Sequence, residues 1–336
     1  MCCRCGEIHC GEYEIMSDLG YVLAKIHGIH AKSIVGETLE QYKKIDSIDK
    51  LEHALFAGEP TDMPTKQVYT KIEDRFRTKI VNQITDITKY LGTDNSVINA
   101  YLMRYETENV KLIVRANLNG EIRKPILTEM HIPNGLNYRL IAETDLSQPD
   151  ALQKVLSGTI FSFVSETMSK NNTVADADNE LDKFYYTNLL AAAKTLPKEQ
   201  RQTLMSIIND EINLTNIIWI MRLQQYYKID EDKIKTMIIA ADGVLTAEEL
   251  LAMTNTDSPH ESKVLRKYRG IFENVFVNDN TDITKADKSA EQYINYRYRK
   301  MFTQEYNILS VVAYIYIKMQ EYSDIVQITE TLRYKA

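Results

Sequence analysis

Polar and apolar residues recur along the chain at spacings that predict helices, and one arrangement is especially informative. It lies within residues 101–117 and combines two polar residues, two β-branched residues and a closing arginine. Residues three, four and seven apart share one face of a helix, so these side chains should lie in line. We call this arrangement the frame, and its first copy consists of Glu106, Asn109, Val110, Ile113 and Arg115.

The frame returns twice at a nearly constant distance. The second copy consists of Asn213, Asn216, Ile217, Ile220 and Arg222. The third copy consists of Glu321, Asp324, Ile325, Ile328 and Glu330. Its Asp324 stands where the earlier copies have Asn, and its Glu330 stands where they have Arg. Asn109, Asn216 and Asp324 are 107 (216 − 109) and 108 (324 − 216) residues apart. The long period therefore predicts three related units.

Each unit shows the same order of helical patterns, which is a short helical pair, a long helix and a second long helix with the frame. Long helices are predicted at 70–91, 97–117, 180–196, 198–227, 286–302 and 306–333. Short elements are predicted at 38–43, 47–56, within 140–161 and within 245–272, with further helices at 18–34 and 230–241. No stretch alternates as a strand does. The sequence predicts an all-α protein.

A period near 107 residues is too long for a helical-repeat array, which recurs at about 33 to 47 residues. Three tandem helical domains, related by an approximate rotation about an axis, fit it better. We therefore expect units at 16–119, 120–228 and 229–336, preceded by a non-functional extension at 1–15.

Composition narrows the classes of function. The chain has 336 residues, is 44% hydrophobic and contains only 12 Gly and 7 Pro, which is ordinary globular usage with few helix breakers. A net charge of −7 does not favour unspecific binding to nucleic acid. The longest apolar run, 308–317, is shorter than the roughly 20 residues that a membrane span needs. We expect neither nucleic acid as a partner nor a direct membrane span.

The cysteines all lie in the first ten residues, as Cys2, Cys3, Cys5 and Cys10, beside His9. Thiolates and imidazole suit zinc, but the spacing matches no standard site. We interpret the cluster as part of the extension, and zinc binding is the alternative. His27 and His30 have no matching ligand at a metal-binding spacing, so a surface or groove position is the better interpretation.

Candidate catalytic chemistry is missing from the sequence patterns. The sequence contains neither a Gly-x4-Gly-Lys-Ser/Thr loop, which binds phosphates, nor a Gly-x-Gly-x-x-Gly turn at the start of a helix. The oxygens of residues 278–282 resemble a calcium loop, but Ile283 replaces its glycine and Ser289 its final acid, so a solvated linker is favoured. No histidine has an evident nucleophile or carboxylate partner in sequence. We expect no catalytic residue, no cofactor and no metal.

The frame itself allows two interpretations. Its polar residues could hydrogen-bond to neighbouring helices, because they share a face with β-branched residues of the kind found in cores. They could instead line an inner surface that contacts a partner. The first interpretation is favoured, and the residues in question are Glu106, Asn109, Arg115, Asn213, Asn216, Arg222, Glu321 and Asp324.

Three features together resemble a known family. They are the tandem frames, a tyrosine-containing opening helix with Tyr21-Val-Leu-Ala-Lys, and the ending Tyr314-Ile-Tyr-Ile-Lys318-x-x-Glu321. From about Leu19 to the C-terminus, the chain resembles the C-type subunit of bacterial and archaeal V-type ATPases and ATP synthases, whose eukaryotic counterpart is the d-type subunit. The cysteine extension, Asp324 and Glu330 depart from the family pattern.

The resemblance implies a funnel of three helical domains with pseudo-threefold symmetry. Such a subunit sits on the cytoplasmic face of the membrane rotor ring and receives the tip of the central shaft. It would transmit torque for proton or sodium translocation, with the shaft and ring subunits as partners and no catalysis of its own. The alternatives are a stand-alone helical scaffold or adaptor and, less favoured, an unrecognised helical hydrolase.

Overall fold

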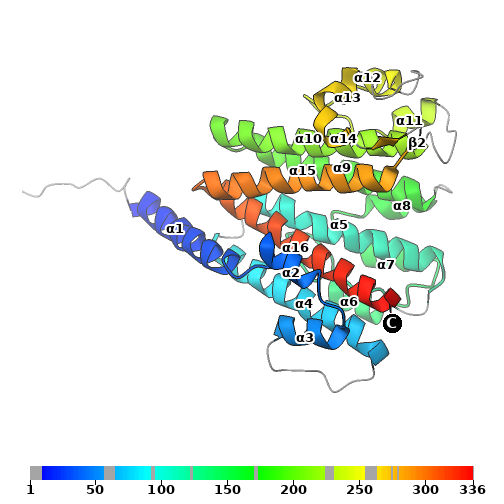
Figure 1. Cartoon of the computed structure of the whole chain (residues 1–336). Helices are drawn as coiled ribbons and strands as arrows, with labels where there is room; N and C mark the ends of the chain where they lie inside the picture. Colours follow the sequence, from blue (N-terminus) through cyan, green and yellow to red (C-terminus); the bar gives the residue numbers. More distant parts are fainter. Residues whose placement is uncertain are drawn as a thin grey trace, which may run out of the picture. The chain divides into compact units, whose positions relative to one another are not determined.

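The computed structural model (Figure 1) describes residues 10–56, 65–91, 95–121, 124–169, 173–223, 231–253, 263–273, 275–277 and 280–335. Helices make up most of this part of the chain. The chain divides into two compact units. Unit 1 comprises residues 1–98, 128–130 and 301–336, and unit 2 comprises residues 99–127 and 131–300. Each unit is described by itself.

Unit 1 is built around its last helix. Its helices are α1 (Cys10–His30), α2 (Glu37–Tyr42), α3 (Ile48–Phe56), α4 (Thr65–Thr88) and α16 (Ile308–Lys335), with a 3-10 turn η1 (Lys89–Leu91). α16 packs along α4 and also contacts α1 and α3. The side chains of residues 309–315 are all fully buried, whichever face of the helix they occupy. A helix that is apolar on all sides belongs in a core, so α16 forms the core of unit 1.

The pattern of α4 shows how the sequence sets this packing. Its apolar residues at steps of three and four form one stripe, and all of them are buried: Ile72, Phe76, Ile80, Ile84 and Ile87. Burying each such side chain contributes about 1.5 to 3 kcal/mol. The stripe predicted for this helix is thus the face that it buries within unit 1.

Unit 2 contains most of α5 (Ser96–Leu118) and α15 (Ile283–Gln304) and all helices between them. These are α6 (Tyr138–Glu143), α7 (Ala151–Leu156), α8 (Phe163–Ser169), α9 (Val174–Lys194), α10 (Lys198–Arg222), α11 (Glu231–Met237), α12 (Ala247–Ala252), α13 (Lys263–Lys267) and α14 (Arg269–Phe272). Capping boxes begin α9, at Thr173 and Asp176, and α12, at Thr246 and Glu249. Each box satisfies amides that have no partner inside the helix.

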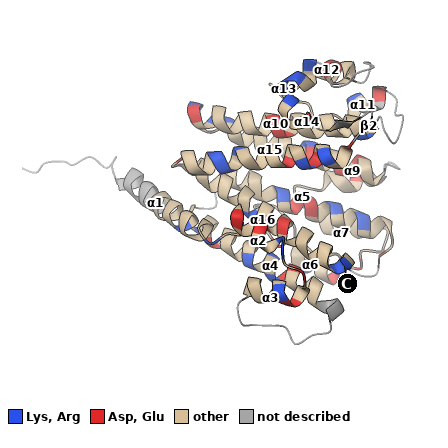
Figure 2. Ribbon diagram, viewed as in Figure 1, with Lys and Arg blue, Asp and Glu red and all other residues tan. Residues whose placement is uncertain are grey.

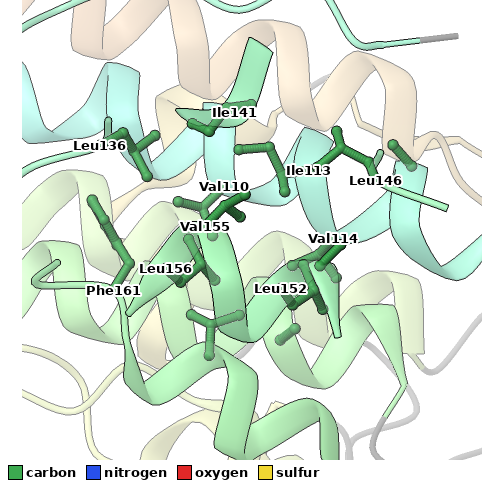
Figure 3. Packing of buried hydrophobic residues seen from close by; sticks show 14 of the residues in the cluster. Val110, Ile113, Val114, Leu136, Ile141, Leu146, Leu152, Val155, Leu156 and Phe161 are labelled. Atoms are coloured by element: carbon green, nitrogen blue, oxygen red, sulfur yellow. The ribbon is translucent and has the colours of Figure 1, made fainter. Parts of the chain in front are cut away.

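The β-branched residues of the first frame lie in the core of unit 2. Val110 and Ile113 of α5 belong to a buried cluster that also contains Leu152 and Val155 of α7 (Figure 3). Both frame residues are fully buried. The apolar half of the frame therefore packs against the short helices that follow α5 in the sequence.

The predicted all-α class is confirmed. The long helices lie close to their predicted bounds, and Pro197 separates α9 from α10 as expected. The sequence predicted no strand, but the described part of the chain contains an antiparallel hairpin of two-residue strands, β1 (Phe276–Val277) and β2 (Asn280–Thr281). Its second strand lies in the segment 278–282 that was interpreted as a solvated linker, of which residues 278–279 fall outside the described residues.

The first helix differs from its prediction at both ends. α1 begins at Cys10 rather than at 18, because residues such as Glu12, Glu14 and Met16 favour a helix and extend it past Asp18. It ends at His30 rather than 34, and Gly36 then takes a φ of 58°, which suits glycine.

Two interpretations of the sequence remain predictions. Cys2, Cys3 and Cys5 lie outside the described residues, so the interpretation of residues 1–15 as an extension stays a prediction. The boundaries of the three predicted units stay predictions too. Among the described residues, no helix is both long enough and apolar enough to span a bilayer.

Candidate functional site

The first polar residue of each frame accepts a hydrogen bond from a distant backbone amide. We call each of these contacts a clasp. The donor and acceptor pairs are Leu136 N and Glu106 Oε1 (3.2 Å), Leu245 N and Asn213 Oδ1 (2.8 Å), and Ile34 N and Glu321 Oε1 (2.8 Å). The first two clasps lie in unit 2 and the third in unit 1. One position of the repeat therefore makes one contact three times.

Each clasped amide stands shortly before a short helix. Leu136 precedes α6, Leu245 precedes α12 and Ile34 precedes α2. The accepting side chains are buried, and a buried polar group without a partner costs about 1 to 3 kcal/mol. A shift of the short helix along the frame helix would break the bond. The clasp therefore sets the register between the two elements.

The third clasp joins segments from opposite ends of the sequence. In unit 2, the clasped residue follows its frame helix along the chain. In unit 1, Ile34 and Glu321 are 287 residues apart. For the two clasps of unit 2, the predicted boundaries at residues 119 and 228 fall between the frame helix and the segment that it clasps.

Among the described residues, no cation hydrogen-bonds to the carboxyl group of the first clasp. Tyr138 donates its hydroxyl hydrogen to Glu106 Oε1 at 3.3 Å, and Asn109 Nδ2 donates to the Tyr138 oxygen at 3.2 Å. A Cβ at Gly135 would overlap the Glu106 carboxyl group, so a larger residue there would force this side chain to shift. Burial raises the pKa of Glu106 to about 7, against the lowering effect of the Leu136 amide and the Tyr138 hydroxyl.

The second clasp uses neutral amides. Asn213 Nδ2 donates to the Tyr268 hydroxyl at 3.0 Å. Asn216 donates to the carbonyl of Ile239 at 2.9 Å and accepts from the amide of the same residue at 3.0 Å. Asn216 thus replaces both backbone partners that Ile239 would have in a helix or sheet. An asparagine in this place does not titrate.

The third clasp contains a buried ion pair. Lys318 Nζ lies 2.6 Å from Glu321 Oε2 and donates to Ser33 Oγ at 2.7 Å. The two charged side chains are only 2% and 4% exposed. Burial lowers the pKa of Lys318, and the neighbouring Glu321 carboxylate raises it in part. Asp324 differs from Asn109 and Asn216, because it is half-buried and is paired at 3.4 Å with Gln320 of its own helix.

The closing arginine of the frame makes an ion pair to the next long helix. Arg115 Nη2 lies 2.5 Å from Asp178 on α9, and Arg222 pairs with Asp287 on α15. In the third copy Glu330 occupies this place, and Arg333, one turn later, contacts Glu330 at 2.6 Å and Glu73 on α4 at 3.4 Å. The ion pair is thus kept but moved along the helix, and the sequence interpretation missed Arg333.

A second buried network also escaped the sequence interpretation. Glu211 accepts from Arg104 at 2.7 Å, from Tyr186 at 3.2 Å and from Tyr298 at 3.4 Å. The hydroxyls of Tyr101 and Tyr298 lie 2.8 Å apart. Arg104 and Glu211 each stand two residues before the first frame position, so opposite charges at one position of the repeat were the signal for this pair.

These polar groups are arranged to hold structure. Their partners are backbone amides, tyrosine hydroxyls and opposite charges of neighbouring helices. Hollows of about 380 and 630 Å³ in unit 2 are lined by other residues and by none of the eight frame residues singled out. Within the described ranges, no group of three or more His, Cys, Asp or Glu side chains could hold a metal ion.

The fold and the clasps define a class of protein: an all-helical chain in which one helix motif is used three times to hold neighbouring backbone in register. The family of the ATP synthase (C/AC39) subunit matches residues 22–336, so the chain belongs to this family. The match confirms the resemblance stated from the sequence. Its relatives include C-type subunits of A-type ATP synthases and of a V-type sodium ATPase.

Individual relatives agree with the family match. The C-type subunit of an A-type ATP synthase from Methanosarcina barkeri is 22% identical over 204 residues, which cover 60% of this chain and 56% of the relative. Its equivalent from Methanosarcina acetivorans is 27% identical over 165 residues, 48% of this chain and 45% of the relative. The chain thus spans about half the length of these archaeal relatives. The C-type subunit of a V-type sodium ATPase from Enterococcus hirae is 20% identical over 308 residues, 88% of each chain.

Proposed function

We propose that the protein is the coupling subunit of the central rotor in a V-type or A-type ATPase or ATP synthase. It would form a socket between the central shaft and the membrane rotor ring and transmit torque for the translocation of protons or sodium ions. The observation that carries this proposal is the clasp made three times at one position of the repeat. Three equivalent units suit a shaft end that is held from three sides.

The clasps also suit a part that bears load. Each one ties the start of a short-helix segment to a long helix through a buried hydrogen bond. Sliding of one element past the other would leave buried polar groups unpaired, at about 1 to 3 kcal/mol for each. We propose the units at residues 16–119, 120–228 and 229–336, arranged as a pseudo-threefold funnel.

The proposed role is not catalytic. The subunit would lie on the cytoplasmic face of the membrane, held there by shaft and ring subunits. The ion would bind in the ring, so the choice between H⁺ and Na⁺ belongs to that partner. The polar frame residues would act mainly through the clasps, and direct contacts to the shaft are the second role proposed for them.

Reconstitution with the purified shaft and ring subunits tests the proposal. We expect one stable complex that contains all three components, and loss of coupled ion transport when this subunit is left out. The isolated chain should hydrolyse ATP only at background rate. A chain that binds neither shaft nor ring would instead be a stand-alone helical scaffold, and turnover by the isolated chain would favour an enzyme.

A further inference from the structure

A dense group of cations lies on two short helices of unit 2. α13 and α14 carry Lys263, Arg266, Lys267 and Arg269, and no acidic residue occurs from Lys263 to Phe272. All four cations are exposed. We call them the basic corner, and Figure 2 shows the blue of Lys and Arg on α13. In a chain of net charge −7, such a concentration of positive charge is a local exception.

A hollow of about 630 Å³ lies directly beside the basic corner. It is lined by Lys267, Lys285, Tyr268, Tyr293 and Tyr296, among others. Tyr296 is 60% exposed. Tyrosines offer an apolar face together with a hydroxyl group, and they are enriched where proteins bind one another. The hollow thus joins positive charge to aromatic surface.

The carboxylate of Asp210, which lies close to Lys267, is already paired within the chain. Asp210 accepts from the hydroxyls of Tyr268 at 2.9 Å and Tyr293 at 3.1 Å, and it forms an ion pair with Arg297. Lys267 lies 3.3 Å from the same carboxylate, but its side chain is 57% exposed. An ammonium group has three donors, so Lys267 can also donate to a group in the hollow.

We propose that the basic corner and its hollow dock an acidic segment of a protein partner. Carboxylates of that segment would pair with Arg266, Lys267 and Arg269, since guanidinium groups bind carboxylates through two parallel hydrogen bonds. Apolar side chains of the segment would lie against Tyr293 and Tyr296. The inference rests on the proposed function, because the partner is another subunit of the rotary complex.

The hollow favours a protein partner over a membrane surface. Cations bind anionic lipid headgroups through a screened surface potential and need no cavity. Here Lys267 borders a recess that also contains the hydrogen-bonding side chains of Ser289 and Gln292. A recess lined by tyrosines and polar side chains suits a polypeptide segment, because aromatic residues are enriched at the core of protein–protein interfaces.

Charge reversal in the reconstituted complex tests the inference. The variant Arg266→Glu/Arg269→Glu is compared with Lys154→Glu/Lys198→Glu, which changes exposed residues of the same unit by the same net charge. We expect at least tenfold weaker binding of the partner by the first variant only, together with a weaker dependence on salt. Circular dichroism checks that both variants are folded.

Photo-crosslinking identifies the partner. A photoreactive residue replaces Tyr296 in the full chain, and the matched control replaces the exposed Tyr334 of α16. Adducts from position 296 to an acidic stretch of a shaft or ring subunit support the inference.

The other outcomes overturn it in distinguishable ways. If the wild-type chain joins the complex and both double variants bind equally well, the docking site is wrong and the proposed function stands. If the wild-type chain does not join the complex, the proposed function fails and the docking site fails with it. Binding to phosphatidylserine vesicles that only the arginine variant loses would assign the basic corner to a lipid surface.

Discussion

The first clasp in unit 2 and the third clasp in unit 1 have the same geometry but different charge. In both, a buried glutamate accepts a backbone amide, from Leu136 in one and from Ile34 in the other. Glu321 has Lys318 beside it, whereas the hydrogen-bond partners of Glu106 are an amide and a tyrosine hydroxyl. The repeat therefore keeps the position of an acceptor and not its charge.

The difference determines how each clasp can fail. A buried charge needs a partner of opposite charge, and removing one member of a buried ion pair costs about 3 to 5 kcal/mol. A buried carboxyl group without a cation can take up a proton instead, so its failure depends on pH. Variants at the two sites can separate the stability that comes from the ion pair of Glu321 from the pH-dependent stability that comes from Glu106.

The largest effect is expected for Lys318→Met. This variant leaves the buried Glu321 carboxylate without its cation, so the free energy of unfolding at neutral pH should fall by about 3 to 5 kcal/mol. Equilibrium unfolding in urea measures it. The double variant Lys318→Met/Glu321→Gln should recover much of the loss, because the glutamine can still accept the Ile34 amide. Equal losses in both variants would show that the ion pair is not the source of stability.

The pH dependence at Glu106 is the next largest effect. Its pKa is raised to about 7 in the folded state, so the stability from this group is fully present below the unfolded pKa of 4.5 and is lost as pH rises through about 7. A shift of this size corresponds to on the order of 3 kcal/mol. Glu106→Gln should match the wild type at pH 4 and be more stable at pH 8. A wild-type profile that Glu106→Gln leaves unchanged would contradict the assignment.

Gly135→Ala tests the close approach in the first clasp. The added methyl group would overlap the Glu106 carboxyl group, and such overpacking typically costs about 1 to 3 kcal/mol. The matched control is Gly20→Ala in α1, where a Cβ would meet nothing within 4 Å. There we expect a gain of about 0.5 to 1 kcal/mol, since alanine is the better helix former. Thermal unfolding of both variants makes the comparison.

The smallest effect separates the second polar positions of two frames. Asn216→Ala removes both partners of the Ile239 backbone and should lower stability by about 1 to 2 kcal/mol. Asp324→Ala, at a half-buried position, should cost less than about 0.5 kcal/mol. If Asn216→Ala kept the free energy of unfolding of the wild type but no longer bound the shaft subunits, a contact role of the frame would be favoured over a structural one.

The helices were predictable from the sequence because their cause is local. Ile72 and Ile87 lie on one stripe of α4, and the spacing of that stripe alone indicates the helix. The frame on α5 and its recurrence on α10 and α16 could be found in the same way. Helix ends were less predictable, as α1 shows by beginning at Cys10.

The partners of the frame were not predictable, because they depend on which distant segments meet. No local pattern links Glu321 to Ile34, which lies 287 residues away. Arg104 and Glu211 are opposite charges at the same position of the repeat, which is visible in the sequence. This pattern is informative only once α5 and α10 are known to face each other. The repeat identifies a residue's role in its unit before it identifies the residue's neighbour.

The place of α16 in unit 1 has a consequence for how the protein is made. The ribosome synthesises α1 to α4 first, and residues 89–335 must follow before α16, which packs along α4, is complete. At about 5 to 20 residues per second, this delay is roughly 10 to 50 s. During that time Phe76 and its apolar neighbours have no cover from α16. The packing of unit 1 around α16 can thus be completed only after residue 335 has been synthesised, whereas α5 to α10 of unit 2 are synthesised well before that point.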